Sequence, residues 1–271
     1  MAVYLTGIRH RPDFPGPGAE GAGFPVDLPA GRALDGLAFG TPVTFLVGEN
    51  GCGKSTVIET MAAGLRAVAV GSYDIDQDPT LAHARALAGA LRFVRRRSPR
   101  RVMFFRAEDA FGFSKRVAWE LDQLGGLERD FAAELPDGSY GQKLATGVAR
   151  GQRAALAGRY GDDPDAASHG ETFLNLLTER IKPNGLYILD EPETPLSPSR
   201  ALALLSLLMR RAGEGCQFVI ATHSPILMAL PGATILQLDR DGIRRVAWDD
   251  VEHVAITRAF LNNPAGYLKE L

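Results

Sequence analysis

Cysteine is scarce in this sequence, since Cys52 and Cys216 are the two that occur among 271 residues. Two cysteines cannot build a disulfide framework, which favours a reducing compartment. No uninterrupted apolar run approaches the roughly 18 residues that a membrane-spanning helix needs. The start, Met1 to Thr6, lacks the basic segment and apolar stretch of a secretory signal. We therefore expect a soluble, cytoplasmic protein.

A strong net charge is also missing, because the formal charge is -2. The chain as a whole therefore has no general attraction for nucleic acid or an anionic membrane, and any such contact must be local. Hydrophobic residues make up 45% and charged residues 23%, which argues against general disorder. The length allows one large domain or two small ones.

The most informative stretch runs from Phe45 to Thr56, where an apolar strand leads through glycines into a helix. Its spacing fits the pattern G-x-x-x-x-G-K-[ST], in which backbone N–H groups surround phosphate oxygens and the lysine adds a cation. A chance glycine-rich turn is the alternative, and the flanking strand and helix argue against it. The pattern predicts a nucleoside triphosphate as the ligand, bound by Gly48, Glu49, Asn50, Gly51, Cys52, Gly53, Lys54, Ser55 and Thr56, with Ser55 on Mg²⁺.

A second apolar strand, residues 186–189, ends in the paired acids Asp190 and Glu191. Adjacent carboxylates after a buried strand are costly unless a cation or a proton transfer uses them. By position, we expect Asp190 to hold Mg²⁺ and Glu191 to be the general base toward water. An acidic turn after a core strand is the alternative. His223 follows the next strand and should lie beside Glu191, although a lone histidine is more often structural.

These ordered motifs resemble the ATP-binding-cassette (ABC) superfamily, in particular its soluble branch. Asp190-Glu191-Pro192-Glu193, followed by Leu196-Ser197-Pro198, is similar to the Walker B and D-loop segments of chromosome-maintenance, DNA-repair and overcoming-lysogenization-defect ATPases. The resemblance implies ATP and Mg²⁺ as ligands, His223 and Lys54 as catalytic groups, and a dimer that closes around two nucleotides.

The resemblance also implies the fold. It implies an α/β fold with the three-layer core of P-loop NTPases of the ABC type, a helical subdomain and N-terminal β elements. It implies one domain, 1–271, with the core at about 1–75 and 183–271 and the helical or irregular part at about 76–182.

The family's signature segment should precede the acids by a little over twenty residues, where this chain has Ala167-Ser168-His169-Gly170-Glu171. Ser168 and Gly170 match the family pattern, whereas Ala167 and His169 depart from it. The resemblance implies that Ser168, Gly170 and Glu171, with the helix that follows, bind the γ-phosphate held by a second subunit. Alternatively, Ser168 caps that helix and Glu171 completes a capping box.

The family's glutamine that couples Mg²⁺ to the helical region is not obvious in this chain. Glu108, which follows the strand at 102–105, is our candidate for that place and for a metal ligand. Gln77 is a second candidate. A surface acid at the end of a strand is an equally good interpretation of Glu108.

Hydrophobic spacing outlines the remaining elements. It predicts strands at 3–8, 43–47, 102–105, 186–189, 217–222, 234–238 and 243–247. It predicts helices at 54–69, 81–94, 114–135, 171–181, 198–212 and 249–261, and irregular structure at 11–29 and 136–168. Strands that alternate with helices in this way indicate a three-layer α/β core.

Six arginines lie within residues 92–101. We interpret them as a solvated helix end or as a site that binds nucleic-acid phosphates. Three functions follow from the motifs. The first is an ATPase that closes as a homodimer to drive or switch an unknown protein partner. The second is the ATP-binding subunit of a membrane transporter, and the third is a slow ATP-switched scaffold for nucleic acid or for defence.

Overall fold

The structure is a computed structural model that describes residues 3–14, 29–70, 74–160, 169–239 and 242–270. Its strands form two sheets. The strands are β1 (Leu5–His10), β2 (Val43–Val47), β3 (Val68–Ala69), β4 (Leu91–Arg95), β5 (Val102–Arg106), β6 (Leu186–Asp190), β7 (Gln217–Ala221), β8 (Thr234–Asp239) and β9 (Gly242–Val246).

Seven of these strands build the central sheet, in the order β3-β5-β6-β7-β2-β8-β9. All neighbours in it are parallel except β8 and β9, which form an antiparallel hairpin. Every residue of β2 and β7 is buried, as expected for parallel strands that helices cover on both faces. The other two strands, β1 and β4, pair antiparallel in a small separate sheet.

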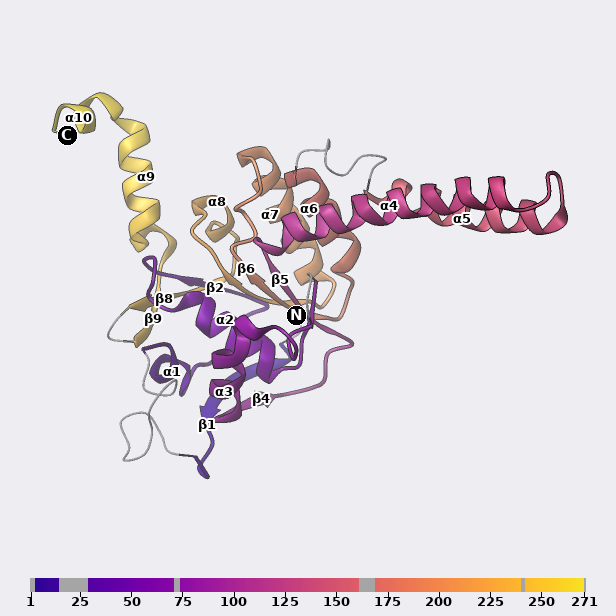
Figure 1. The fold of residues 1–271 in the computed structure, drawn as a ribbon. Helices are drawn as coiled ribbons and strands as arrows, with labels where there is room; N and C mark the ends of the chain where they lie inside the picture. Colours follow the sequence, from indigo (N-terminus) through magenta and orange to yellow (C-terminus); the bar gives the residue numbers. More distant parts are fainter. Residues whose placement is uncertain (1–2, 15–28, 71–73, 161–168, 240–241, 271) are drawn as a thin grey trace.

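The described helices cover both faces of the central sheet and extend beyond it (Figure 1). They are α1 (Pro29–Leu34), α2 (Lys54–Gly64), α3 (Ala82–Gly89), α4 (Asp109–Glu134), α5 (Tyr140–Tyr160), α6 (His169–Arg180), α7 (Pro198–Gly213), α8 (Pro225–Met228), α9 (Glu252–Asn262) and α10 (Pro264–Glu270). Short 3-10 turns occur at Pro79–Leu81 and Trp248–Asp250. Among these helices, none has both the length and the apolar character needed to cross a membrane.

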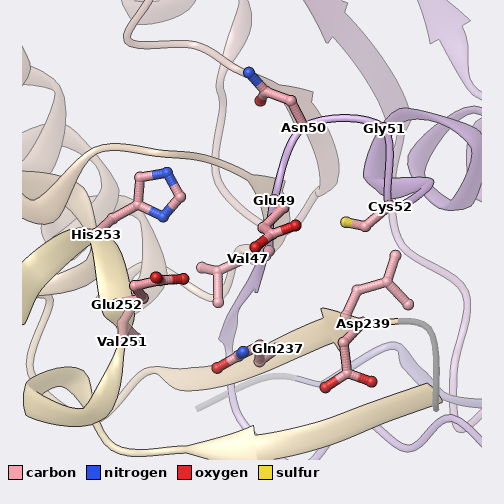
Figure 2. A pocket seen from close by; sticks show the side chains of 12 residues that line it. Val47, Glu49, Asn50, Gly51, Cys52, Gln237, Asp239, Val251, Glu252 and His253 are labelled. Atoms are coloured by element: carbon pink, nitrogen blue, oxygen red, sulfur yellow. The ribbon is translucent and has the colours of Figure 1, made fainter.

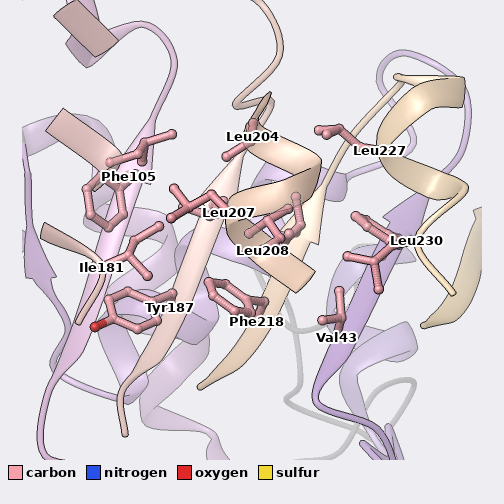
Figure 3. Close-up of a cluster of buried hydrophobic side chains, with 14 of the residues drawn as sticks. Val43, Phe105, Ile181, Tyr187, Leu204, Leu207, Leu208, Phe218, Leu227 and Leu230 are labelled. Atoms are coloured by element: carbon pink, nitrogen blue, oxygen red, sulfur yellow. The ribbon is translucent and has the colours of Figure 1, made fainter. Parts of the chain in front are cut away.

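Two hydrophobic clusters fill the space on either side of the sheet, because side chains alternate along each strand. On β7, Phe218 faces the cluster under α6 and α7, while Val219 faces the cluster under α2 and α3. Figure 3 shows the first cluster, where strand residues meet leucines of α7. The predicted three-layer α/β core with N-terminal β elements is thereby confirmed.

The segment 136–168, predicted as irregular, contains the 21-residue helix α5. This helix packs antiparallel against the 26-residue α4, and the pair projects from the core as a helical hairpin (Figure 1). Contacts such as the ion pair of Arg150 with Glu128, at 2.8 Å, support α5 in spite of its glycines. The prediction was wrong for 140–160, and residues 161–168 lie outside the described part.

The helix predicted at 81–94 is also wrong at its end, because α3 stops at Gly89 and Leu91–Arg95 is a strand paired with β1. The arginine cluster therefore lies on a strand and the turn after it, and not at a helix end. The helix predicted at 54–69 stops at Gly64 and is followed by β3. The expected loop at 11–29 falls mostly outside the described residues.

Strand β5 lies within 76–182 but belongs to the main sheet, where it pairs with β3 and β6. The helical part inserted into the core therefore begins at α4, after this strand, and includes α5 and α6. The division of the chain into a core and a helical part stays a prediction with this shifted boundary.

A buried glutamine joins the small sheet to the large one. Gln217, at the start of β7, is fully buried, and its Oε1 accepts from the backbone N–H groups of Tyr4 and Leu5 at 2.7 and 2.9 Å. Its Nε2 donates to the carbonyl oxygen of Leu5 at 2.9 Å. One amide therefore satisfies three backbone groups that would otherwise be buried without partners.

We expect Gln217→Met to lower the free energy of unfolding by about 3 kcal/mol, because methionine fills the space and leaves those backbone groups unpaired. Urea denaturation measures the loss. The matched control is Gln123→Met on the exposed side of α4, which should stay within about 0.5 kcal/mol of the parent. Equal stability of the two variants would contradict this account of Gln217.

Candidate functional site

Strands β2, β6 and β7 end at the same edge of the central sheet. The register pairs Leu46 of β2 and Asp190 of β6 with the same residue, Ala221 of β7. Thr222 N donates to the carbonyl oxygen of Leu46 at 3.2 Å, and Glu191 N donates to that of Ala221 at 2.9 Å. The phosphate loop (residues 48–53), the paired acids and the histidine segment are therefore brought together, as the sequence predicted.

Two features fix the shape of the phosphate loop: the close approach of Gly48 to the backbone of Leu238, and the hydrogen bonds of Lys54. A Cβ on Gly48 would lie 2.3 Å from the carbonyl oxygen of Leu238, so no side chain fits there. Lys54, at the start of α2, is 5% exposed, and its Nζ donates to the carbonyl oxygens of Gly48 and Glu49, each at 2.9 Å. The ammonium group is thereby fixed at the mouth of the loop, where an anion would contact it.

A pocket of about 620 Å³ opens beside this loop. Figure 2 shows its walls, which come from the loop itself, the end of β8 and the first residues of α9. Several lining side chains are polar or charged, among them Glu49, Asn50, Gln237, Asp239 and His253. Its size and position suit the part of a nucleotide that extends away from the phosphates.

Asp190 and Ser55 form the part of the site that fits a divalent cation. The Ser55 hydroxyl hydrogen-bonds the Asp190 carboxyl, whose Oδ1 is buried and has no partner. A carboxylate oxygen and a hydroxyl are ligands that Mg²⁺ accepts when phosphate and water complete its shell. Among the described residues, no group of three acids, histidines or cysteines could hold a metal.

Burial raises the pKa of Asp190 to about 7, and the charge of Glu191 adds to this effect against the hydrogen bond from Ser55. The carboxylate form is therefore poorly compensated by the protein. A bound cation would supply the missing charge.

Glu108 does not share this environment. Its side chain is 73% exposed, and its Oε1 lies 3.0 Å from Nη1 of Arg106. Its role as a metal ligand stays a prediction. The second candidate, Gln77, is exposed in the turn before Pro79, where its N–H donates to Asp74.

Glu191 lies where the chain turns sharply after β6. Its φ is 47°, a left-handed conformation that costs a residue with a Cβ about 1 kcal/mol or more. Its Oε1 lies 3.5 Å from Nε2 of His223, so the histidine lies beside the acid as predicted. Burial lowers the pKa of His223, and Lys54 and His253 lower it further, which favours a neutral ring.

Glu193 is a site residue that the sequence analysis did not single out. It is partly buried, and its Oε1 accepts from the Thr222 hydroxyl at 2.7 Å and from the N–H groups of His223 and Ser224 at 2.7 and 3.1 Å. These bonds fix the turn that carries His223. A second acid two residues after Glu191 was the signal available in the sequence.

Arg106, at the end of β5, was also missed. Its side chain is 8% exposed, and its guanidinium contacts Glu59 of α2 at 2.6 Å and Asp78 at 3.5 Å. Asp190 is its register partner on β6. This buried cation therefore links the helix after the phosphate loop to the strand that ends in the acids.

The predicted signature segment is only partly described. Ser168 and Ala167 lie outside the described residues, and α6 begins at His169. A Cβ on Gly170 would lie 2.4 Å from the carbonyl oxygen of Pro195, so this glycine allows α6 to pack against the segment after the acids. Glu171 forms an ion pair with Arg200 of α7 at 2.9 Å. Their contact with a nucleotide stays a prediction.

Two sequence matches agree with this geometry. A family model described as "AAA domain, putative AbiEii toxin, Type IV TA system" matches residues 171–229, which include Asp190, Glu191 and His223. The ribose import ATP-binding protein RbsA of Pseudomonas putida is 28% identical over 251 residues, covering 88% of this chain and 45% of that protein. The chain thus spans less than half the length of this relative.

Solved structures give more distant likenesses. The SMC head domain from Thermotoga maritima is 16% identical, with a TM-score of 0.39, and the alignment covers 90% of this chain and 98% of that one. A nucleotide-free ATP-binding cassette from an ABC transporter is also 16% identical, with a TM-score of 0.43 and 96% of each chain covered.

The raised pKa of Asp190 predicts that the free energy of unfolding of the metal-free protein falls as pH rises. Its pKa is 3.8 in the unfolded chain and about 7 in the fold, so the stability tied to its protonated form is lost as pH rises through about 7. We therefore expect Asp190→Asn to gain stability relative to the parent between pH 5.5 and pH 8.5 when EDTA is present.

Urea denaturation at both pH values measures this gain, with Asp130→Asn on exposed α4 as the control. Added Mg²⁺ should stabilise the parent at pH 8.5 and leave Asp190→Asn unchanged, because a ligand stabilises the state that binds it. Parallel pH curves for parent and Asp190→Asn would contradict the assigned pKa.

Proposed function

We propose that this ABC-type ATPase domain binds ATP with Mg²⁺ at the carboxyl edge of its parallel sheet and hydrolyses it with Glu191 as general base. The observation that carries the proposal is the meeting of five side chains from the start of α2, the end of β6 and the segment after β7. They are the ammonium of Lys54, the hydroxyl–carboxylate pair of Ser55 and Asp190, and the carboxylate of Glu191 next to His223.

Each group has a task that its environment supports. The N–H groups of the phosphate loop and Lys54 bind and neutralise the phosphate oxygens. Mg²⁺, held by Ser55 and Asp190, would supply Lewis acidity at the phosphates when it is bound. Glu191 accepts a proton from the attacking water, and neutral His223 can donate a hydrogen bond to the terminal phosphate.

We further propose that two copies close head to tail around two nucleotides. The N-terminus of α6, with Ser168, Gly170 and Glu171, would then meet the γ-phosphate held by the partner's phosphate loop. The first N–H groups of a helix have no partners within it and attract anions, which supports this role. Binding would drive closure, and hydrolysis would release it.

We expect Glu191→Gln to keep ATP binding and to lose hydrolysis by about 10²- to 10⁴-fold, the usual effect of removing a general base. Phosphate release measures turnover, and fluorescence titration with a labelled ATP analogue measures binding. Glu134→Gln, at the exposed end of α4, is the control and should match the parent. Parental turnover in Glu191→Gln would refute the assigned base.

The same variant traps the proposed dimer. In the Glu191→Gln background, MgATP should double the mass measured by light scattering, whereas ADP should leave a monomer. Adding Ser168→Glu should prevent the doubling, because a carboxylate repels the partner's γ-phosphate, while each copy still binds ATP in its own loop. A dimer that is indifferent to ATP and to Ser168→Glu would contradict the nucleotide sandwich.

The match to a sugar importer's ATP-binding protein favours one alternative, the ATP-binding subunit of a membrane transporter. This alternative requires a separate membrane protein as partner. Detergent extraction of membranes, followed by affinity purification of this chain, would test it. Recovery of an integral membrane protein that raises ATP turnover would favour the transporter, and its absence would favour the dimer acting on its own.

A further inference from the structure

His253 contacts His223 at the edge of the sheet where the site lies, and the proposed mechanism does not use this contact. It is the second residue of α9, and its Nε2 lies 3.2 Å from Nδ1 of His223. The two ring centroids are 4.8 Å apart, with an interplanar angle of 62°. The opposite nitrogen of His223, Nε2, lies 3.5 Å from the Glu191 carboxylate. Three side chains from three elements therefore form a row that ends at α9.

Hydrogen-bond chemistry decides where the protons lie in this row. Nε2 of His223 is buried and makes no hydrogen bond, and it faces the Glu191 carboxylate at 3.5 Å; because a carboxylate only accepts, we assign the ring hydrogen to this nitrogen. In a neutral ring, Nδ1 of His223 is then bare and must accept. The partner across 3.2 Å, Nε2 of His253, is accordingly the donor. A bond from His253 to Nδ1 is thus consistent with one tautomer of His223, the one with its N–H toward Glu191.

The start of α9 is anchored firmly enough to hold this contact. Val251 and Val254 are each 2% exposed, in the cluster beneath α7. Nε1 of Trp248 donates to the carbonyl oxygen of Pro225 at 3.1 Å, which ties the approach to α9 to the segment after His223. Beyond this anchor, α9 and α10 lead away from the core (Figure 1). The position of His253 therefore depends on how the start of α9 packs against the core.

We propose that His253 is a positioning residue for ATP hydrolysis, which holds His223 as the Nε2–H tautomer by donating to its Nδ1. The proposal rests on the proposed function, because His223 acts there next to the base. In this proposal, His253 acts by binding His223 and not by binding the nucleotide, although it also lines the pocket beside the phosphate loop.

Three variants test the assignment in steady-state ATP turnover. His253→Phe keeps a ring but removes the donor, and we expect kcat to fall about 10-fold or more, the usual loss when a supporting hydrogen-bond partner is removed. KM should stay within about twofold. His253→Gln places an amide N–H near the position of Nε2 and should recover kcat to within about threefold of the parent. Thr257→Ala, exposed on the same helix, is the control and should match the parent.

The outcomes separate three explanations. A rise in KM with unchanged kcat would mean that His253 binds nucleotide directly, and it would overturn the proposal. Equal losses in His253→Phe and His253→Gln, with lowered melting temperatures, would indicate a structural role and would also overturn it. Glu191→Gln, assayed alongside, distinguishes failure of the proposed function from failure of the positioning role of His253. If the parent and Glu191→Gln turn over equally, the proposed function fails; if they differ but His253→Phe matches the parent, the positioning role alone fails.

Discussion

Strand β7 pairs in parallel with β2 on one side and with β6 on the other, and the site depends on this pairing. Parallel strands end at a common edge, so segments far apart in the sequence emerge there together. Backbone hydrogen bonds then extend the pairing past the strands, from Thr222 to Leu46 and from Glu191 to Ala221. The phosphate loop, the acids and the histidine turn are therefore fixed relative to one another by the sheet itself.

The acids gathered at this edge are compensated unequally. Glu59 has the guanidinium of Arg106. Oε1 of Glu193 accepts from two backbone N–H groups and a hydroxyl, although its Oε2 is buried without a partner. Asp190 has one hydrogen bond from Ser55, its Oδ1 has no partner, and burial raises its pKa to about 7. Together with the left-handed backbone of Glu191, this imbalance marks a site at which stability is given up for ligand binding.

The sequence predicted the parts of the site whose chemistry is local. The glycines and lysine of the phosphate loop lie within a few residues of one another, and Asp190 and Glu191 directly follow an unbroken apolar strand. The parallel strands at 43–47, 102–105 and 186–189 were equally readable, because they are short apolar runs between turn signals. Their meeting at one edge followed from the α/β pattern.

The missed features depend on contacts between distant segments. Helix α5 contains several glycines and reads as irregular, but packing against α4 stabilises it. The strand at Leu91–Arg95 exists because β1 pairs with it, and helical spacing concealed this pairing. Arg106 and His253 act through partners between 28 and 47 residues away, and no local pattern reveals such contacts. Glu193 left a partial signal, because it follows Glu191 by two residues, but its bonds to the turn at His223 could not be read from the sequence.

Two projecting helical elements begin at residues close to the site, and this arrangement offers routes by which a partner could act on it. The hairpin of α4 and α5 starts three residues after Arg106, whose guanidinium contacts Glu59 on the helix of the phosphate loop. Helix α9 starts next to His253, which contacts His223. Suppose that a projecting element could pack on the core in two positions. A partner that bound one position more tightly would then raise the population of that position. Helix α9 is continuous from its outer end to His253, so such a shift in α9 would move the residue that contacts His223. Arg106 lies on β5, before α4 begins, so a shift of the hairpin would have to pass through the residues that join β5 to α4.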